Sequence, residues 1–129
     1  MLIPTPYNQT TSAIIGAAID VHRILGPGLL ESAYTRCLKH ELSARSMRFS
    51  SEIAIPLSYK GIERDQSYRV DLIVENSVVV EVKSVETVMP VHRAQLLTYL
   101  KLTSCPIGLL INFNEATLVD GVHRIMNPT

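Results

Sequence analysis

Residues 68–83 read YRVDLIVENSVVVEVK, and this stretch decides the fold. Two runs rich in valine and isoleucine flank a polar break at residues 75–77. Branched apolar residues favour strands, and a short polar break between two such runs favours a tight turn. The stretch therefore predicts a β-hairpin whose two strands lie in the interior of a sheet.

Three charged residues interrupt these apolar runs, namely Asp71, Glu81 and Lys83. Side chains alternate along a strand, so Glu81 and Lys83 point to one face and the valines beside them to the other. If Asp71 lies opposite Glu81, the loop is residues 75–77, and the two carboxylates share a face with Cβ atoms about 5 Å apart. Two anions at that distance repel each other unless a cation lies between them. A hard divalent metal, Mg²⁺ or Mn²⁺, is the expected cation.

The composition limits the fold and the possible partners. A chain of 129 residues predicts one domain over residues 1–129, with residues 1–8 as an irregular N-terminal segment. Twelve basic and twelve acidic residues cancel, so an anionic partner must be met by a local basic patch. No apolar run approaches the roughly 20 residues that span a bilayer, so no membrane partner is expected. Cys37 and Cys105 lack metal-ligand spacing and predict reduced thiols in a cytoplasmic protein.

Apolar periodicity and turn residues divide the chain into elements. Helices are expected over residues 9–25, from about 29 to 44, and from 90 to about 102. Strands are expected over residues 49–59, 66–74, 78–83, 106–112 and, as a last short one, 116–125. The order α-α-β-β-β-α-β-β places one helix between two strands, which suggests a right-handed crossover. The fold class is therefore α/β (α+β), a single domain with a mixed central sheet flanked by helices.

The charged residues of the hairpin belong to a longer ordered pattern. Asp71 precedes Glu81-x-Lys83, and the next helix carries Gln95 and Tyr99 four residues apart. In this order the residues resemble the PD-(D/E)xK nuclease superfamily, which implies a restriction-endonuclease-like core.

An earlier segment, GLLESAY at residues 28–34, resembles the motif of the GxxExxY family of that superfamily. The resemblance extends from His22 to about Phe113. One departure is Val70, which stands before Asp71 where the superfamily pattern has proline; the superfamily tolerates this change.

The chemistry of these residues suits phosphodiester hydrolysis. Carboxylate oxygens hold Mg²⁺ or Mn²⁺ and leave coordinated waters that can lose a proton. The backbone carbonyl of Val82 is a candidate further ligand, and Lys83 would orient the attacking water or stabilise charge on the phosphate. The alternatives are structural: Asp71 is a solvated carboxylate near the turn, and Glu81 belongs to a surface row of alternating charges or to an ion cluster with Asp71 and Lys83.

The resemblance adds residues from both helices to the site. It implies that Glu31 points at the metal and completes three carboxylates, although a glutamate in a first helical turn is also favoured by the helix dipole alone. It implies that Gln95 and Tyr99 border the active site, whereas ordinary amphipathicity explains the same spacing. Tyr34 is expected to be a half-buried packing residue with its hydroxyl near the site.

Other residues are weaker candidates. Phosphate or supporting contacts are considered for His22 and His92, with a helix-end histidine as the alternative for His22. Local positive charge is considered for Arg69, Arg93 and Lys101, each of which can equally be a solvated cation.

The sequence therefore predicts a metal-dependent nuclease acting on DNA or RNA, with DNA favoured. Its catalytic set is Glu31, Asp71, Glu81, Lys83, Gln95 and Tyr99, and its metal ligands are Glu31, Asp71, Glu81 and the Val82 carbonyl. One alternative is a nucleic-acid or protein interaction module that keeps the site without turnover. Another is a hydrolase of small phosphate compounds. So small a domain is expected to need a homodimer or a protein partner for specificity.

Overall fold

Helices and strands follow the predicted order in the computed structural model, which describes residues 5–129 except the side chains of residues 5, 6, 57 and 63–67. A short 3₁₀ helix is the one addition within this part of the chain. The elements are α1 (Thr5–Leu25), α2 (Glu31–Ala44), β1 (Phe49–Tyr59), β2 (Ile62–Val74), β3 (Val78–Lys83), α3 (Pro90–Thr103), β4 (Ile107–Asn112), η1 (Leu118–Gly121) and β5 (Val122–Met126).

The strands form one mixed sheet in the order β1-β2-β3-β4-β5. β3 and β4 are parallel and are joined through α3, whereas the other neighbours are antiparallel. The predicted mixed α+β domain is thus confirmed. In the parallel pair, Lys83 lies opposite Asn112, so the end of β3 meets the end of β4.

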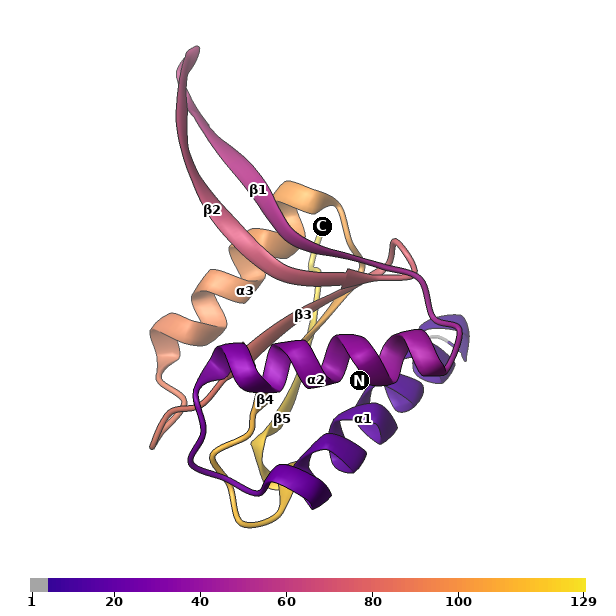
Figure 1. The fold of residues 1–129 in the computed structure, drawn as a ribbon. Coiled ribbons are helices and arrows are strands. Elements are labelled where there is room, and N and C mark those ends of the chain that lie inside the picture. Colours follow the sequence, from indigo (N-terminus) through magenta and orange to yellow (C-terminus); the bar gives the residue numbers. More distant parts are fainter. Residues whose placement is uncertain (1–4) are drawn as a thin grey trace.

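Helices cover both faces of the sheet (Figure 1). Val80 points to the face covered by α1 and α2, where it packs in one buried cluster with Ala18 and Leu38. Val79 points to the other face and packs in a second cluster with Leu96 and Tyr99 of α3. Adjacent valines are buried on opposite faces, which explains the unbroken apolar run of β3. Among the described residues, no helix is long and apolar enough to cross a membrane.

β1 and β2 extend as a two-stranded arm beyond the rest of the domain (Figure 1). The register of their pairing shifts between Ile55 and Leu57, around Pro56. Proline cannot donate to a ladder and is tolerated in an edge strand, which is the position of β1. The arm therefore begins near the middle of these strands, where the pairing loses its regular register.

Three predicted boundaries are wrong. α1 begins at Thr5, so residues 5–8 are helical, and only residues 1–4 of the expected irregular segment lie outside the described chain. A proline in a first turn loses no helical hydrogen bond, so Pro6 does not delay the helix. β2 begins at Ile62 rather than residue 66, because its backbone pairing with β1 extends to Tyr59 opposite Ile62. The last predicted strand is divided into η1 and the shorter β5.

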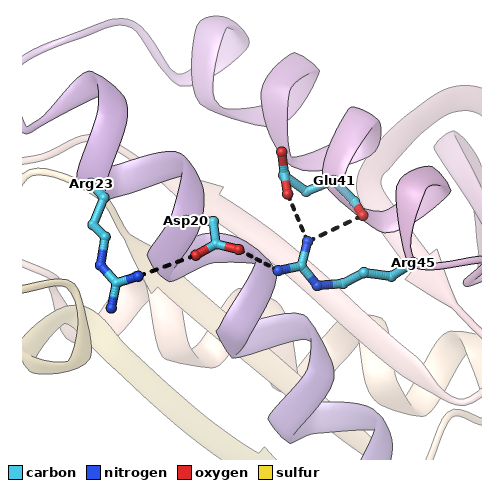
Figure 2. Close-up of polar contacts among 4 residues, drawn as sticks. All are labelled: Asp20, Arg23, Glu41 and Arg45. Carbon is cyan, nitrogen blue, oxygen red and sulfur yellow. Dashed lines mark hydrogen bonds and ion pairs between the residues drawn. The ribbon is translucent and has the colours of Figure 1, made fainter.

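The two helices on one face are joined by an ion-pair chain (Figure 2). Arg45, which follows α2, contacts Asp20 of α1 and lies 2.7 Å from a carboxylate oxygen of Glu41. Asp20 also contacts Arg23 at 3.5 Å. Surface pairs of this kind contribute at most about 1 kcal/mol each. This series of ion pairs fixes the relative orientation of α1 and α2 more than it stabilises the domain.

The first prediction concerns the packing of η1 on β4. A Cβ at Gly121 would lie 2.2 Å from the carbonyl oxygen of Asn112. Gly121→Ala is expected to lower the free energy of unfolding by about 1–3 kcal/mol, because backbone must move. The matched control is Gly16→Ala in α1, where nothing lies within 4 Å and alanine favours the helix by up to about 1 kcal/mol. Urea unfolding measures both, and equal stability of the two variants would contradict the packing.

Candidate active site

Asp71 and Glu81 face each other where β2 and β3 separate. The ladder pairs Val74 with Val78, Ile73 with Val79, and Leu72 with Val80. The next pair in this register is Asp71 and Glu81, as the sequence predicts, with residues 75–77 as the loop.

Backbone pairing ends at this point, and the two carboxylates replace it. The Asp71 N–H donates to Oε2 of Glu81 at 2.8 Å, and the Val82 N–H donates to Oδ2 of Asp71 at 2.8 Å. Each carboxylate thus accepts a hydrogen bond from the opposite strand. Beyond the pair, β2 continues into the arm while β3 continues beside β4 (Figure 1).

Burial and mutual repulsion control the ionisation of the pair. Glu81 is only 5% exposed. Burial and the charge of Asp71 raise the pKa of Glu81 to about 8, against the lowering effects of the Asp71 N–H and of Lys83. Burial also raises the pKa of Asp71, with the Val82 N–H as the largest opposing effect. Without a cation, the pair therefore tends to retain a proton.

The pair is chemically suited to a divalent cation. One oxygen of each carboxylate accepts a backbone N–H, and among the described residues the other oxygens have no hydrogen-bond partner. No buried side-chain oxygen in the described chain lacks a partner, so these two oxygens reach solvent. In the same part of the chain, no three His, Cys, Asp or Glu side chains are grouped to hold a metal by themselves. Mg²⁺ commonly binds one or two carboxylates and completes its coordination with water and phosphate, so the donor set fits.

Glu31 is the first residue of α2 and lies at the end of β3. Its Oε2 accepts the Ser84 N–H at 3.1 Å, while the Ser84 hydroxyl donates to the Leu29 carbonyl at 2.6 Å. Its charge contributes to the raised pKa values of Asp71 and Glu81. Glu31 is therefore within electrostatic range of the pair, and its carboxylate is exposed.

Lys83 is half-buried and follows Glu81 by two residues on the same strand. Its charge acts to lower the pKa of both Asp71 and Glu81. It forms no ion pair within the described part of the chain. The ion cluster considered as the structural alternative is thus absent among these residues, and the ammonium group is available to another anion.

α3 brings Tyr99 to the pair. Tyr99 is buried, and burial together with the charges of Glu81 and Asp71 raises its pKa to about 12. Gln95 lies one turn earlier on the same face and is half-buried. Together they border a hollow beside the carboxylates.

Tyr34, His22 and His92 have clear structural contacts. Tyr34 is fully buried rather than half-buried, stacks on Phe113 at 4.5 Å, and its hydroxyl donates to the Gly26 carbonyl at 2.5 Å. His22 is bonded through Nε2 to the carbonyl of residue 115 at 2.8 Å. His92 accepts the backbone N–H of residue 89 at 2.9 Å and so caps α3.

The candidate cations are placed apart from one another. Arg69 donates to the Glu52 carbonyl at 3.4 Å, Arg93 contacts His123 at 2.8 Å, and Lys101 is exposed near the end of α3. Other cations line, together with Asp71, a hollow of about 420 Å³ that we call the α2 hollow. Its lining comprises Glu31, Ser32, Thr35, Arg36, Lys39, Glu52 and Asp71.

Some residues at the site were not foreseen. The Asn112 side chain accepts a hydrogen bond from the Val85 N–H at 3.0 Å and donates one to the Val85 carbonyl at 2.9 Å. These two bonds fix the segment after Lys83. A signal was present, because the otherwise apolar strand β4 ends on the polar residue Asn112. Arg36 and Lys39 were also recognisable, since they follow Glu31 on one side of the same helix.

Comparison with known proteins agrees with this geometry. A family model described as the PD-(D/E)XK nuclease superfamily matches residues 8–125. The crystal structure of SSO0001 superposes with a TM-score of 0.58 at 22% sequence identity, over 76% of this chain and 50% of that one. At that identity the likeness supports the fold alone, and the chain spans half the length of SSO0001. No curated protein matches the chain significantly.

The second prediction follows from the ionisation of Glu81. Its folded pKa is about 8 against an ordinary value of 4.5, so the folded state retains a proton that the unfolded state has lost. Stability from this group is complete below pH 4.5 and is lost as the pH rises towards 8, with a slope of at most about 1.4 kcal/mol per pH unit. Glu81→Gln keeps the acceptor without the proton equilibrium and is expected to reduce this loss.

Chemical unfolding in a metal chelator, repeated across this pH window, measures the effect. The matched control is Glu86→Gln, which changes an exposed carboxylate in the segment after β3. Identical pH slopes for wild type, Glu81→Gln and Glu86→Gln would show that Glu81 ionises normally.

Proposed function

Because the chain belongs to the PD-(D/E)XK nuclease superfamily, we propose that it is a metal-dependent nuclease that hydrolyses phosphodiester bonds. The observation that carries this proposal is the pair of carboxylates, buried Glu81 and half-buried Asp71, at the point where β2 and β3 separate. Each has one oxygen bonded by the opposite strand and one oxygen without a hydrogen-bond partner among the described residues. In the motif that the sequence resembles, these two residues are the expected metal ligands.

The proposed ligands of Mg²⁺ or Mn²⁺ are Asp71, Glu81 and the Val82 carbonyl, with Glu31 close by. A residue in a strand directs its N–H and C=O to the same edge. The Val82 N–H reaches Asp71, so its carbonyl faces that carboxylate as well. When bound, the metal would polarise the phosphate and lower the pKa of an attacking water. Glu31 is exposed and can assist directly or through water.

The remaining residues act on the phosphate and on the water. Lys83 has a free ammonium group on the strand that carries Glu81, and it is proposed to stabilise the negative charge that develops on the phosphate. The Tyr99 hydroxyl keeps its proton, since its pKa is raised to about 12, and therefore serves as a hydrogen-bond donor. Gln95 borders the same space and is proposed to orient substrate.

We further propose that the chain belongs to the GxxExxY family. Gly28 has a positive φ of 97°, Glu31 opens α2, and the Tyr34 hydroxyl holds the loop between them. Each residue of the motif thus has a distinct physical task in presenting Glu31. DNA remains favoured over RNA as the substrate, with a homodimer or a protein partner supplying specificity. Both cysteines are free, in keeping with a cytoplasmic location.

The second candidate is a binding module that keeps the site without turnover. The balanced net charge favours it, because a small neutral domain attracts nucleic acid weakly. The carboxylate pair argues against it, since two anions weaken the binding of a phosphate unless a metal is present.

The third prediction tests cleavage directly. The purified chain is incubated with linear duplex DNA, single-stranded DNA and RNA, with Mn²⁺ or with chelator. Mn²⁺-dependent cleavage of at least one substrate is expected, and Asp71→Ala should lower its rate roughly a hundredfold or more. Asp120→Ala is the matched control, because it removes an exposed carboxylate on η1 and should cleave as wild type does. Cleavage that survives in Asp71→Ala at the wild-type rate would remove the nuclease assignment.

The fourth prediction separates metal binding from chemistry. Lys83→Met should bind Mn²⁺ as wild type does, because the lysine is not a proposed ligand, whereas Glu81→Ala should bind it more weakly. Cleavage by Lys83→Met should fall by roughly two to three orders of magnitude. Calorimetric titration and cleavage rates measure the two effects.

The control for this experiment is Lys101→Met, which removes an exposed lysine at the end of α3. It should match wild type in both measurements. Full activity of Lys83→Met would assign Lys83 to the solvated surface, and equal Mn²⁺ affinity of Glu81→Ala would exclude Glu81 as a ligand.

A further inference from the structure

A second hollow lies on the α3 side of the carboxylates, and we call it the tyrosine groove. Its volume is about 410 Å³, within the roughly 300–1,000 Å³ typical of small-molecule sites. One residue of β2 and five of α3 line it, namely Tyr68, Val91, Ala94, Gln95, Thr98 and Tyr99. None of these described lining residues carries a formal charge at neutral pH, which distinguishes the tyrosine groove from the α2 hollow.

Two aromatic rings form one side of the tyrosine groove. The ring centroids of Tyr68 and Tyr99 are 6.3 Å apart with an angle of 56° between the planes. Tyr99 is buried, whereas Tyr68 is 48% exposed at the base of the arm. Val91, at the start of α3, is 66% exposed beside them. The Tyr68 ring therefore presents apolar surface to solvent, and such a ring can stack on a planar ligand.

The tyrosine groove and the carboxylate site are linked by Tyr99. Tyr99 lines the groove, and the charges of Glu81 and Asp71 contribute, after burial, to its raised pKa. Tyr68 precedes Asp71 by three residues on β2, a separation of about 10 Å along a strand. Within a nucleotide, one sugar joins the phosphate to the base. A phosphate held at the carboxylates thus brings its base within reach of the groove.

The two hollows on either side of Asp71 differ in charge. The α2 hollow sets Arg36 and Lys39 beside the carboxylates of Glu31, Glu52 and Asp71, so it can receive the charged backbone of a nucleic acid when a cation offsets these carboxylates. Among the described residues, the tyrosine groove offers apolar and neutral polar groups, including the Gln95 amide, which both donates and accepts hydrogen bonds. Phosphates on one side and a base on the other match this division.

We propose that the tyrosine groove binds the unpaired base of a nucleotide whose phosphate lies at Asp71 and Glu81. The substrate is then single-stranded or locally unpaired nucleic acid, because bases within a duplex are stacked on one another and closed to Tyr68. This inference rests on the proposed function, since it takes the phosphate to the carboxylates. Stacking on a tyrosine is tolerant of base identity, so little sequence preference is expected.

Equilibrium binding tests the proposal independently of cleavage. A fluorescently labelled single-stranded oligothymidylate is titrated with the full chain and followed by anisotropy. An oligonucleotide of the same length with abasic sites at every position, and the matching duplex, are titrated in parallel. Ca²⁺ replaces Mn²⁺ as an oxygen-binding divalent cation, and electrophoresis verifies that the oligonucleotides stay intact.

Wild type is expected to bind the single strand roughly tenfold tighter than its abasic counterpart, the usual scale of one stacked base. Tyr68→Ala should abolish that difference, and Tyr68→Phe should retain it because the ring remains. Tyr59→Ala is the matched control, since Tyr59 is an exposed tyrosine at the tip of the same arm. It should retain the full difference.

Equal binding of the base-bearing and abasic strands by wild type would overturn the proposal, as would a full difference in Tyr68→Ala. Tighter binding of the duplex would overturn it as well. These outcomes are distinct from failure of the nuclease assignment. If the protein cleaves in the presence of metal but binds the base-bearing and abasic strands equally, the proposal for the tyrosine groove fails and the nuclease assignment stands. If base-dependent binding is seen in wild type and lost in Tyr68→Ala, but no cleavage occurs, the groove is supported and the binding module is favoured.

Discussion

The structure depends on holding two carboxylates side by side within a sheet. Asp71 and Glu81 each accept a backbone N–H from the opposite strand, and these two bonds replace the ladder where it ends. The bonds offset part of the cost of removing the carboxylates from water. They do not remove the repulsion between the carboxylates, which needs a proton or a cation. Burial first, and this repulsion second, raise the pKa of Glu81.

Neighbouring segments are arranged to keep the ends of β2 and β3 in place. Ser84 bonds both the loop before α2 and the carboxylate of Glu31, while Asn112 at the end of β4 holds both backbone groups of Val85. The Tyr34 hydroxyl closes the same loop by bonding two of its backbone groups. Elements distant in sequence thus meet directly after Lys83. The side chains of these elements bond backbone groups near the end of β3. The second oxygens of Asp71 and Glu81 therefore remain available to a ligand.

Local pattern was sufficient for the parts of the fold that depend on local constraints. The pairing of Asp71 with Glu81 followed from strand alternation and from the length of the loop, both of which act over a few residues. The outer half of β2 could not be predicted, because it is formed by backbone pairing with β1 and its sequence carries no apolar alternation. The hydrogen bonds from Tyr34, His22 and His92 to backbone groups could not be predicted from the sequence either. A sequence shows that a side chain can bond, whereas only the fold decides which backbone group it reaches.

The arrangement of charge argues for a metal-dependent role more strongly than the motif does. A domain that only bound nucleic acid would gain affinity from cations, yet the α2 hollow sets Arg36 and Lys39 beside the carboxylate of Asp71. The carboxylates of buried Glu81 and half-buried Asp71 weaken phosphate binding and, while ionised, oppose folding. Both costs disappear once a divalent cation joins the carboxylates to the phosphate. Apolar residues at these two positions would serve a purely structural sheet better, so the pair is most simply explained by the ligand it can hold.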